Sequence, residues 1–188
     1  MEFEGFHGTD FKNRDSILCN NFSVSAKDDE WLGTGAYFFI DGISDPLVDA
    51  RNWAKVQSYD SETRGKKYHQ YAVIKATIKV DMVLRLDERE GQIAYNVFRN
   101  YLIDKMKRER VRPKVGAIRN DCEVCNHILE NTEFEAIINN EFIKLDSWSR
   151  RNRYSSRVPT CKIISVKEPK SSIDVNALQV VERGKAVS

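Results

Sequence analysis

The sequence has little of what marks membrane-spanning proteins or secreted proteins held together by disulfides. It contains only four cysteines among 188 residues, and no apolar run approaches the length of a membrane span. Its first residues, Met1 to Gly5, are acidic and lack the basic and apolar regions of a secretory signal peptide. We therefore expect a cytoplasmic protein that does not contact a membrane and whose thiols are reduced.

The sequence also lacks repeats, low-complexity segments and a strong net charge. A net charge of +2 is too small for a protein that holds nucleic acid by charge alone. Hydrophobic residues make up 41% of the chain and charged residues 31%, which excludes global disorder. The length fits one domain, which we place at residues 1–175, followed by a C-terminal tail at residues 176–188.

Hydrophobic spacing predicts a chain in which helices and strands are mixed. Apolar residues at helical spacing predict helices over residues 10–21, 46–57 and 92–110. Apolar or alternating runs predict strands over residues 31–40, 71–86, 134–138, 142–145 and 161–166. We expect a turn at Asn139-Asn140 and an exposed loop over residues 147–156. Because strands and helices do not strictly alternate, the order favours an α+β fold over a doubly wound sheet.

Two short motifs contain candidate functional residues, and each has an ordinary structural explanation when taken alone. Phe6-His7-Gly8-Thr9 stands directly before a predicted helix and is compatible with a strand that ends at a turn. Gly33-Thr-Gly-Ala-Tyr37 precedes a predicted strand and is compatible with a bend. It lacks the third glycine and the following helix of a Rossmann dinucleotide site, so we reject that assignment.

Taken together, the two motifs resemble the ADP-ribosyltransferase superfamily. His-Gly-Thr followed by a helix, a polar loop and Trp31-Leu-Gly-x-Gly-x-Tyr-Phe38 is similar to the front half of its His-Tyr branch. That branch includes the PARP-like polymerases and bacterial toxin-like domains. The resemblance extends over residues 5–87, and it implies an α+β fold of the ADP-ribosyltransferase type, a split β-sheet sandwich with flanking helices.

The resemblance implies NAD as co-substrate and a role for each motif residue. His7 would hydrogen-bond a ribose hydroxyl, the backbone of Gly8 would hold the nicotinamide carboxamide, and Tyr37 would stack on the nicotinamide ring. Thr9, Gly33 and Gly35 complete the expected NAD-binding set. The implied enzyme breaks the bond between nicotinamide and ribose and transfers ADP-ribose to a protein or a nucleic acid. If the enzyme is a toxin or a defence effector, a neutralising partner protein is also expected.

The resemblance requires a third catalytic position, usually a glutamate, at the start of a late strand. In the strand over residues 161–166 that position falls near Lys162 or Ile163, and neither is a carboxylate. Glu133 and Glu135 are similar to the Glu-x-Glu motif of the arginine-type branch, in which Glu135 would contact the ribose and Glu133 would activate an acceptor. The simpler interpretation of this pair is a solvated acidic edge. The alternative function is a catalytically degenerate module that binds NAD, ADP-ribose or another nucleotide as a sensor.

The cysteines and the basic residues leave two further alternatives open. Cys122, Cys125, His127 and Cys161 would be four ligands for zinc, although one Cys-x-x-Cys pair is a weak signal and we expect reduced cysteines without a metal. Basic residues cluster over residues 105–114 and 150–157. A helix end accounts for part of the first cluster. Together the clusters favour a phosphate-rich partner, and a basic nucleic-acid-binding protein is the third hypothesis.

Overall fold

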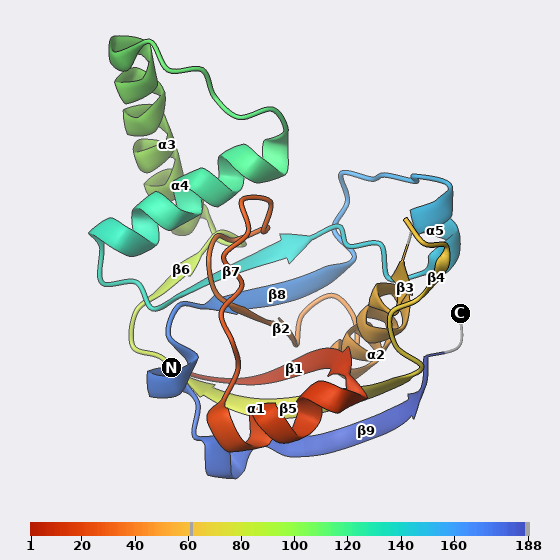
Figure 1. Cartoon of the computed structure of the whole chain (residues 1–188). Helices are drawn as coiled ribbons and strands as arrows, with labels where there is room; N and C mark the ends of the chain where they lie inside the picture. The colour runs from red at the N-terminus through yellow and green to blue at the C-terminus, as the bar shows by residue number, and fades with distance from the viewer. Residues whose placement is uncertain (61, 187–188) are drawn as a thin grey trace.

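Seven strands form one mixed sheet in the computed structural model, which describes residues 1–60 and 62–186 (Figure 1). Their order across the sheet is β6-β7-β8-β2-β1-β5-β9. Their bounds are β1 Glu2–Asp10, β2 Ala36–Ile40, β5 Gln70–Lys79, β6 Val83–Arg85, β7 Ala136–Glu141, β8 Cys161–Val166 and β9 Gln179–Lys185. The β6–β7 pair is parallel and the other neighbours are antiparallel. The expected α+β class is confirmed.

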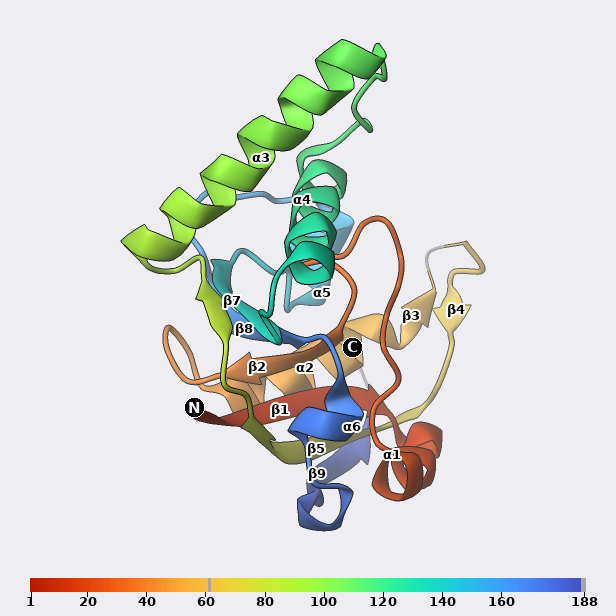
Figure 2. The same ribbon diagram turned by 90° about the vertical axis from the view of Figure 1, so that its left-hand side faces the viewer.

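The helices flank this sheet and connect its strands. Their bounds are α1 Arg14–Asn20, α2 Pro46–Gln57, α3 Arg89–Glu109, α4 Ala117–Asn131, α5 Ser147–Arg151 and α6 Pro169–Ser172. Short 3-10 turns lie at Phe11–Asn13 (η1) and Val175–Ala177 (η2), and a small hairpin joins β3 Tyr59–Asp60 to β4 Gly65–Lys66. Figures 1 and 2 show α3 and α4 rising together from the β6–β7 edge of the sheet. Among the described residues no helix combines the length and apolarity needed to cross a membrane.

Alternate residues of the strands bury two apolar clusters, one on each face of the sheet. On β8, Ile163 packs in the cluster that contains Ala50 and Ala54 of α2 and buried residues of α4. Its neighbour Ile164 packs in the opposite cluster with Phe38, against Phe22 after α1. Helices α2 and α4 therefore cover one face of the sheet, and α1 covers the other.

Helix α2 lies where the local sequence predicts it and packs directly on β1. Asp45 caps its first turn by accepting hydrogen bonds from the backbone N–H groups of Leu47 and Val48, and proline occupies the first helical position. Gly8 of β1 faces this helix: a Cβ at Gly8 would lie 1.9 Å from the carbonyl oxygen of Ala50. The helix and the strand approach each other closely because residue 8 has no side chain.

Several predicted elements agree with the structure. The helices predicted over residues 46–57 and 92–110 correspond to α2 and α3, and the first predicted helix is η1 with α1, capped by Asp10. The last predicted strand is β8. The long predicted strand divides into β5 and β6 around Asp81. However, Ile93, Val97 and Tyr101, expected on the apolar side of the third helix, are at least half exposed on α3, because only part of that helix contacts α4 and β6.

Three segments predicted to be irregular contain helix or strand, and over those residues the predictions were wrong; residues 152–156 are irregular as predicted. Asn139 and Asn140 do not form a turn: pairing with β8 continues through both of them to Glu141. The predicted loop over residues 147–156 begins with the short helix α5, which Asp146 caps through the backbone N–H of Ser149.

The predicted C-terminal tail is largely part of the sheet. Residues 179–185 form β9, which pairs with β5 from Gln70↔Lys185 to Lys75↔Gln179. The backbone N–H of Ala186 donates to the carbonyl oxygen of His69 and extends this contact. The folded unit therefore continues past residue 175, and residues 187–188 of the predicted tail lie outside the described residues.

Candidate active site between strands β1 and β2

The sheet opens between its two central strands, β1 and β2. These strands pair only at Gly5↔Ile40 and Phe6↔Phe39. Beyond this point β1 stays paired with β5 as far as Asp10, and β2 stays paired with β8 as far as Ala36. A cavity of about 180 Å³ lies where they separate. Its lining residues are His7, Gly8, Ser23, Ser25, Glu30, Trp31, Gly35, Ala36, Tyr37, Phe38, Phe39, Trp53, Ile143 and Ile163.

His7 lines this cavity and carries a hydrogen on Nδ1. Its Nδ1 lies 2.9 Å from the backbone carbonyl oxygen of Tyr37. Because a carbonyl oxygen only accepts, Nδ1 carries the hydrogen and Nε2 is left with a free lone pair. The rings of Phe22 and Phe38 pack against the imidazole at centroid distances of 5.1 and 5.8 Å. Burial lowers the pKa of His7 more than the hydrogen bond to Tyr37 raises it, which favours a neutral imidazole that accepts a hydroxyl hydrogen through Nε2.

Two backbone groups of the loop before β2 hold the hydroxyl of Tyr37 in place. Its hydroxyl accepts the backbone N–H of Leu32 at 2.9 Å and donates to the carbonyl oxygen of Gly33 at 2.5 Å. Burial raises the pKa of Tyr37 well above its ordinary value, so the phenol stays protonated. The side chain therefore offers the cavity a rigid aromatic ring rather than an acid.

The two glycines before Tyr37 shape the loop. Gly33 has φ of 77°, a backbone conformation that favours glycine. A Cβ at Gly35 would lie 2.1 Å from Oγ of Ser165 on β8. Of the two glycines only Gly35 lines the cavity. Thr9 does not line it either, because its Oγ1 accepts a hydrogen bond from the side-chain amide of Asn13.

Two tryptophans without an expected role form an aromatic wall of the cavity: Trp31 begins the second motif, and Trp53 lies on α2 outside both motifs. Trp31 packs edge-on against Trp53 at a centroid distance of 5.4 Å and against Tyr37 at 6.3 Å. The guanidinium of Arg150 lies 5.0 Å from the ring of Trp53, on the side of α5. This wall joins the loop before β2 and helix α2 at one cavity, and Arg150 of α5 packs on Trp53.

Of the two residues expected near the third catalytic position, only Ile163 faces the cavity. Ile163 lines it, whereas the side chain of Lys162 lies on the other face of β8, with its Nζ 2.9 Å from the carboxylate of Asp87. The Asp87 side chain is 5% exposed and also binds Arg85. Burial would raise the pKa of Asp87, but the hydrogen bonds and charges of Arg85 and Lys162 lower it overall. Lys162 is therefore part of a structural ion pair.

Neither Glu133 nor Glu135 reaches the cavity, so the structure does not support the predicted catalytic roles of this pair. The carboxylate of Glu135 accepts hydrogen bonds from the backbone N–H groups of Asp81 and Met82, at 2.5 and 3.3 Å. It stabilises the bend between β5 and β6. Glu133 is exposed in the segment before β7. The Glu-x-Glu spacing thus belongs to a structural connection at the edge of the sheet.

Glu30 supplies the carboxylate of this cavity. It is the one acidic residue among the lining residues, and the hydroxyl of Ser25 donates to it. Glu30 ends a polar loop directly before Trp31. The local sequence gives no sign of its role, because the loop is polar throughout and only the fold brings this carboxylate to the cavity.

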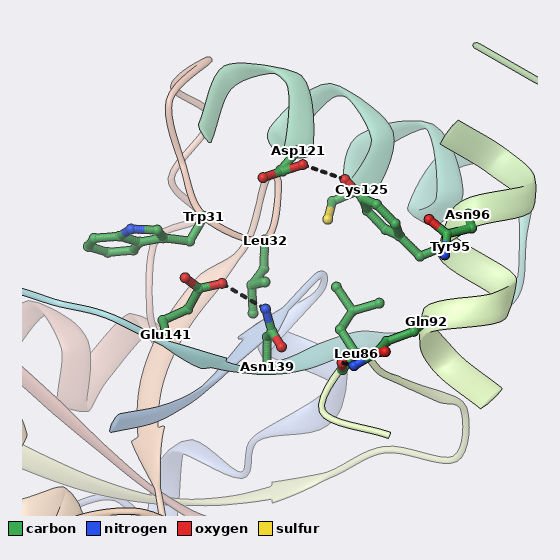
Figure 3. A pocket seen from close by; sticks show the side chains of 10 residues that line it. All are labelled: Trp31, Leu32, Leu86, Gln92, Tyr95, Asn96, Asp121, Cys125, Asn139 and Glu141. Carbon is green, nitrogen blue, oxygen red and sulfur yellow. Dashed lines mark hydrogen bonds between the residues drawn. The ribbon is translucent and has the colours of Figure 1, made fainter. Parts of the chain in front are cut away.

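A second cavity of about 320 Å³ lies on the other side of Trp31, between β7 and the α3–α4 pair (Figure 3). Figure 3 shows Glu141 and Asn139 rising from β7 towards Asp121 on α4. Tyr95 donates to Asp121 at 2.7 Å, and the Asn139 amide donates to Glu141 at 2.8 Å. Burial raises the pKa of Glu141 against the lowering effect of Asn139. Because Trp31 lines both cavities, they are neighbours separated by one indole.

The four candidate zinc ligands do not form a metal site. Cys122 and Cys125 are buried on α4, Cys161 is buried on β8, and all three are free thiols. His127 instead stacks on Tyr101, with ring centroids 5.5 Å apart. Over residues 1–60 and 62–186, no group of three or more histidine, cysteine, aspartate or glutamate side chains is placed to hold a metal ion.

Comparison with known proteins adds no family assignment to this geometry. The sequence matches no protein-family model, and it has no significant match among curated proteins.

Proposed function

We propose that this protein is an NAD-dependent ADP-ribosyltransferase of the His-Tyr type, with its donor site in the cavity between β1 and β2. The observation that carries the proposal is the hydrogen bond between His7 and Tyr37 at the opening of the sheet. The two motif residues lie 30 positions apart in the sequence. The separation of β1 from β2 supports the finer fold assignment, a split sheet of the ADP-ribosyltransferase type.

The cavity suits the nicotinamide end of NAD. Its volume of about 180 Å³ is below the ~300 Å³ at which pockets for drug-sized ligands begin, so it would enclose one part of the dinucleotide. The nicotinamide would stack on the ring of Tyr37, and the backbone of Gly8 would bind its carboxamide. Nε2 of His7 would accept a hydrogen bond from a ribose hydroxyl.

The lining residues also suit the cleavage of the nicotinamide–ribose bond. The bond between C1′ and the nicotinamide nitrogen breaks, and its electron pair leaves with nicotinamide. The ribose then carries oxocarbenium character, as in glycoside hydrolysis. Glu30 would stabilise this positive charge from the side of Ser25. The aromatic wall of Trp31 and Trp53 would exclude water, which favours transfer to an acceptor over hydrolysis.

Release of nicotinamide from NAD by the purified protein tests the proposal. His7→Ala and Tyr37→Ala are expected to lower the release rate by about a hundredfold or more, in the range seen when one transition-state contact is removed. His69→Ala and Tyr101→Ala are matched controls on exposed residues and should leave the rate unchanged. Native release rates in both His7→Ala and Tyr37→Ala would refute the assignment.

A second function, a nucleotide sensor without turnover, is favoured by one observation. Of the two residues expected near the third catalytic position, Ile163 lines the cavity, and its side chain cannot hydrogen-bond a ribose hydroxyl. A sensor would show a higher melting temperature with NAD or ADP-ribose and no release of nicotinamide. Release of nicotinamide with any acceptor would exclude the sensor.

A further inference from the structure

A second concave surface lies beside the candidate active site and is lined mainly by cations. It is a cleft of about 610 Å³ between the end of α2, β3 and α5, which Figure 1 shows side by side. Its lining residues are Lys55, Val56, Tyr59, Lys144, Ser147, Arg150 and Arg151, and we call it the basic cleft. Four of these seven residues are lysine or arginine, and none is acidic. The cleft therefore presents positive charge to whatever it binds.

The four cations have no carboxylate partners. None of them forms an ion pair within the described part of the chain, although eleven such pairs form elsewhere. Arg150 is partly buried and donates only to the backbone carbonyl oxygens of Lys144 at 3.1 Å and Val56 at 3.4 Å. Burial lowers the pKa of Arg150, and no carboxylate among the described residues lies within ion-pair distance to offset the loss of hydration. A bound anion would supply this missing partner.

One exposed aromatic ring lines the cleft, and two more lie on α5 and in the segment after it. Tyr59 lines the cleft and is 44% exposed, and Trp148 on α5 and Tyr154 are 60% and 52% exposed. Trp148 and Tyr154 lie 6.5 Å apart at their ring centroids. Rings of this size cost free energy when left in water, and flat faces beside cations are what single-stranded nucleic acids bind through their bases and phosphates.

One side-chain contact and one pair of adjacent residues place the basic cleft next to the candidate active site. Arg150 lies over Trp53, which lines the His7–Tyr37 cavity. Ile143, the residue before Lys144, lines the same cavity. A chain bound along the cleft would therefore reach the aromatic wall of the active site.

We propose that the basic cleft binds single-stranded nucleic acid and, resting on the proposed function, that this strand is the ADP-ribose acceptor. Phosphates would bind the four cations, and unpaired bases would stack on Tyr59, Trp148 and Tyr154. In the transfer step a base nitrogen or a hydroxyl oxygen of the strand forms a bond to C1′ of the ribose. The bond from C1′ to nicotinamide breaks with its electron pair on nicotinamide, and the acceptor's proton passes to water.

Binding is tested without NAD, so that it is independent of the proposed activity. A fluorescently labelled single strand of mixed sequence, as RNA and as DNA, is titrated with the protein and followed by anisotropy. The double variant Lys144→Glu/Arg151→Glu is expected to weaken binding by at least about tenfold, because each phosphate contact contributes to affinity. The matched control is Lys105→Glu/Arg108→Glu, which makes the same charge change on α3 and should change binding by less than about twofold.

A duplex and an aromatic variant distinguish strand binding from general charge attraction. A duplex of the same sequence is expected to bind at least about tenfold more weakly than the better single strand, because its bases cannot stack on the protein. Trp148→Ala should also weaken single-strand binding at unchanged melting temperature. Equal weakening by the two double variants, or duplex binding as tight as single-strand binding, would overturn the binding proposal.

The acceptor assignment has its own test with labelled NAD. Label fixed to the added single strand, and lost in Lys144→Glu/Arg151→Glu while nicotinamide release persists, would support it. Label fixed only to protein would overturn the acceptor assignment and leave strand binding intact. Strand binding without any nicotinamide release would count against the proposed function and not against the cleft.

Discussion

Nδ1 of His7 donates a hydrogen bond to the backbone carbonyl oxygen of Tyr37 at 2.9 Å, and this contact links the two sequence motifs across the opening of the sheet. It fixes the tautomer of the imidazole and holds the start of β2 next to β1 beyond the last strand pair. The same contact makes stability and function depend on a single neutral histidine, and this dependence can be measured.

The first prediction concerns stability against pH. Burial lowers the pKa of His7, so between about pH 6.5 and that lowered value the unfolded chain binds a proton that the folded protein does not. Stability from His7 is thus fully present above about pH 6.5 and declines as the pH falls towards the folded pKa. Urea unfolding across this range should show a shallower decline in His7→Gln than in the native protein. His69→Gln, on an exposed residue, serves as the control, and identical profiles for the native protein and His7→Gln would contradict the prediction.

The second prediction distinguishes a catalytic role of Glu30 from a structural role of Glu135. Glu30→Gln is expected to lower nicotinamide release by about a hundredfold, because it removes the one negative charge in the cavity lining. Glu135→Gln should retain most of the rate, since its amide oxygen can still accept from the backbone of Asp81 and Met82. Steady-state rates of nicotinamide release from NAD measure the effect of each variant. Loss of release in Glu135→Gln alone would restore the catalytic role suggested by the sequence.

The third prediction concerns the buried ion pair on the far side of β8. Asp87→Asn leaves Lys162 without its counter-ion and Arg85 with only the exposed Glu88, and it should lower the free energy of unfolding by ~3 kcal/mol. Asp104→Asn removes an exposed partner of Lys107 and should leave stability nearly unchanged. Chemical denaturation of both variants makes the comparison. Equal effects would show that burial of Asp87 does not strengthen its ion pair.

The fourth prediction uses the four cysteines. Cys19 is exposed, whereas Cys122, Cys125 and Cys161 are buried, and burial raises the pKa of each of these three thiols. A thiol reagent should therefore label one cysteine rapidly in the native protein and all four in denaturant. Serine at position 19 should abolish the rapid phase. Two or more rapidly labelled thiols would contradict the burial of the other cysteines.

The elements that the sequence predicts best are those with strong local signals. Asp45 and Pro46 mark the start of α2, and apolar runs mark β5 and β8. Helix α4 has no such mark: Gly116 precedes it without a side-chain cap, and its Cys-x-x-Cys pair suggested metal ligands instead. The polar segments at β9 and at the end of β7 become strands because β5 and β8 offer them hydrogen-bonding partners, and no short sequence window contains that information.

The residues of the candidate site also fall into those with a local sequence signal and those that only the fold brings together. The resemblance of two motifs to the His-Tyr branch pointed to His7 and Tyr37, and the structure brings them together. The register of β8 was expected to place residue 162 or 163 at the site, and Ile163 lines the cavity. Trp31 lies in the second motif without an expected role, and only the fold brings Glu30, on the same loop, and Trp53, on α2, to the site. Glu135 has the right spacing in sequence, but the bend at Asp81 binds its carboxylate.

The chain has three tryptophans, and all of them lie at the two surfaces to which we assign function. Trp31 and Trp53 form the wall of the cavity, and Trp148 is exposed on α5 beside the basic cleft. The protein thus contains its own optical reporter. A ligand that enters the cavity would change the emission of the Trp31–Trp53 pair, whereas a bound strand would quench Trp148. Trp148→Phe would separate the two signals, so donor and acceptor binding can be followed in one cuvette without any added dye.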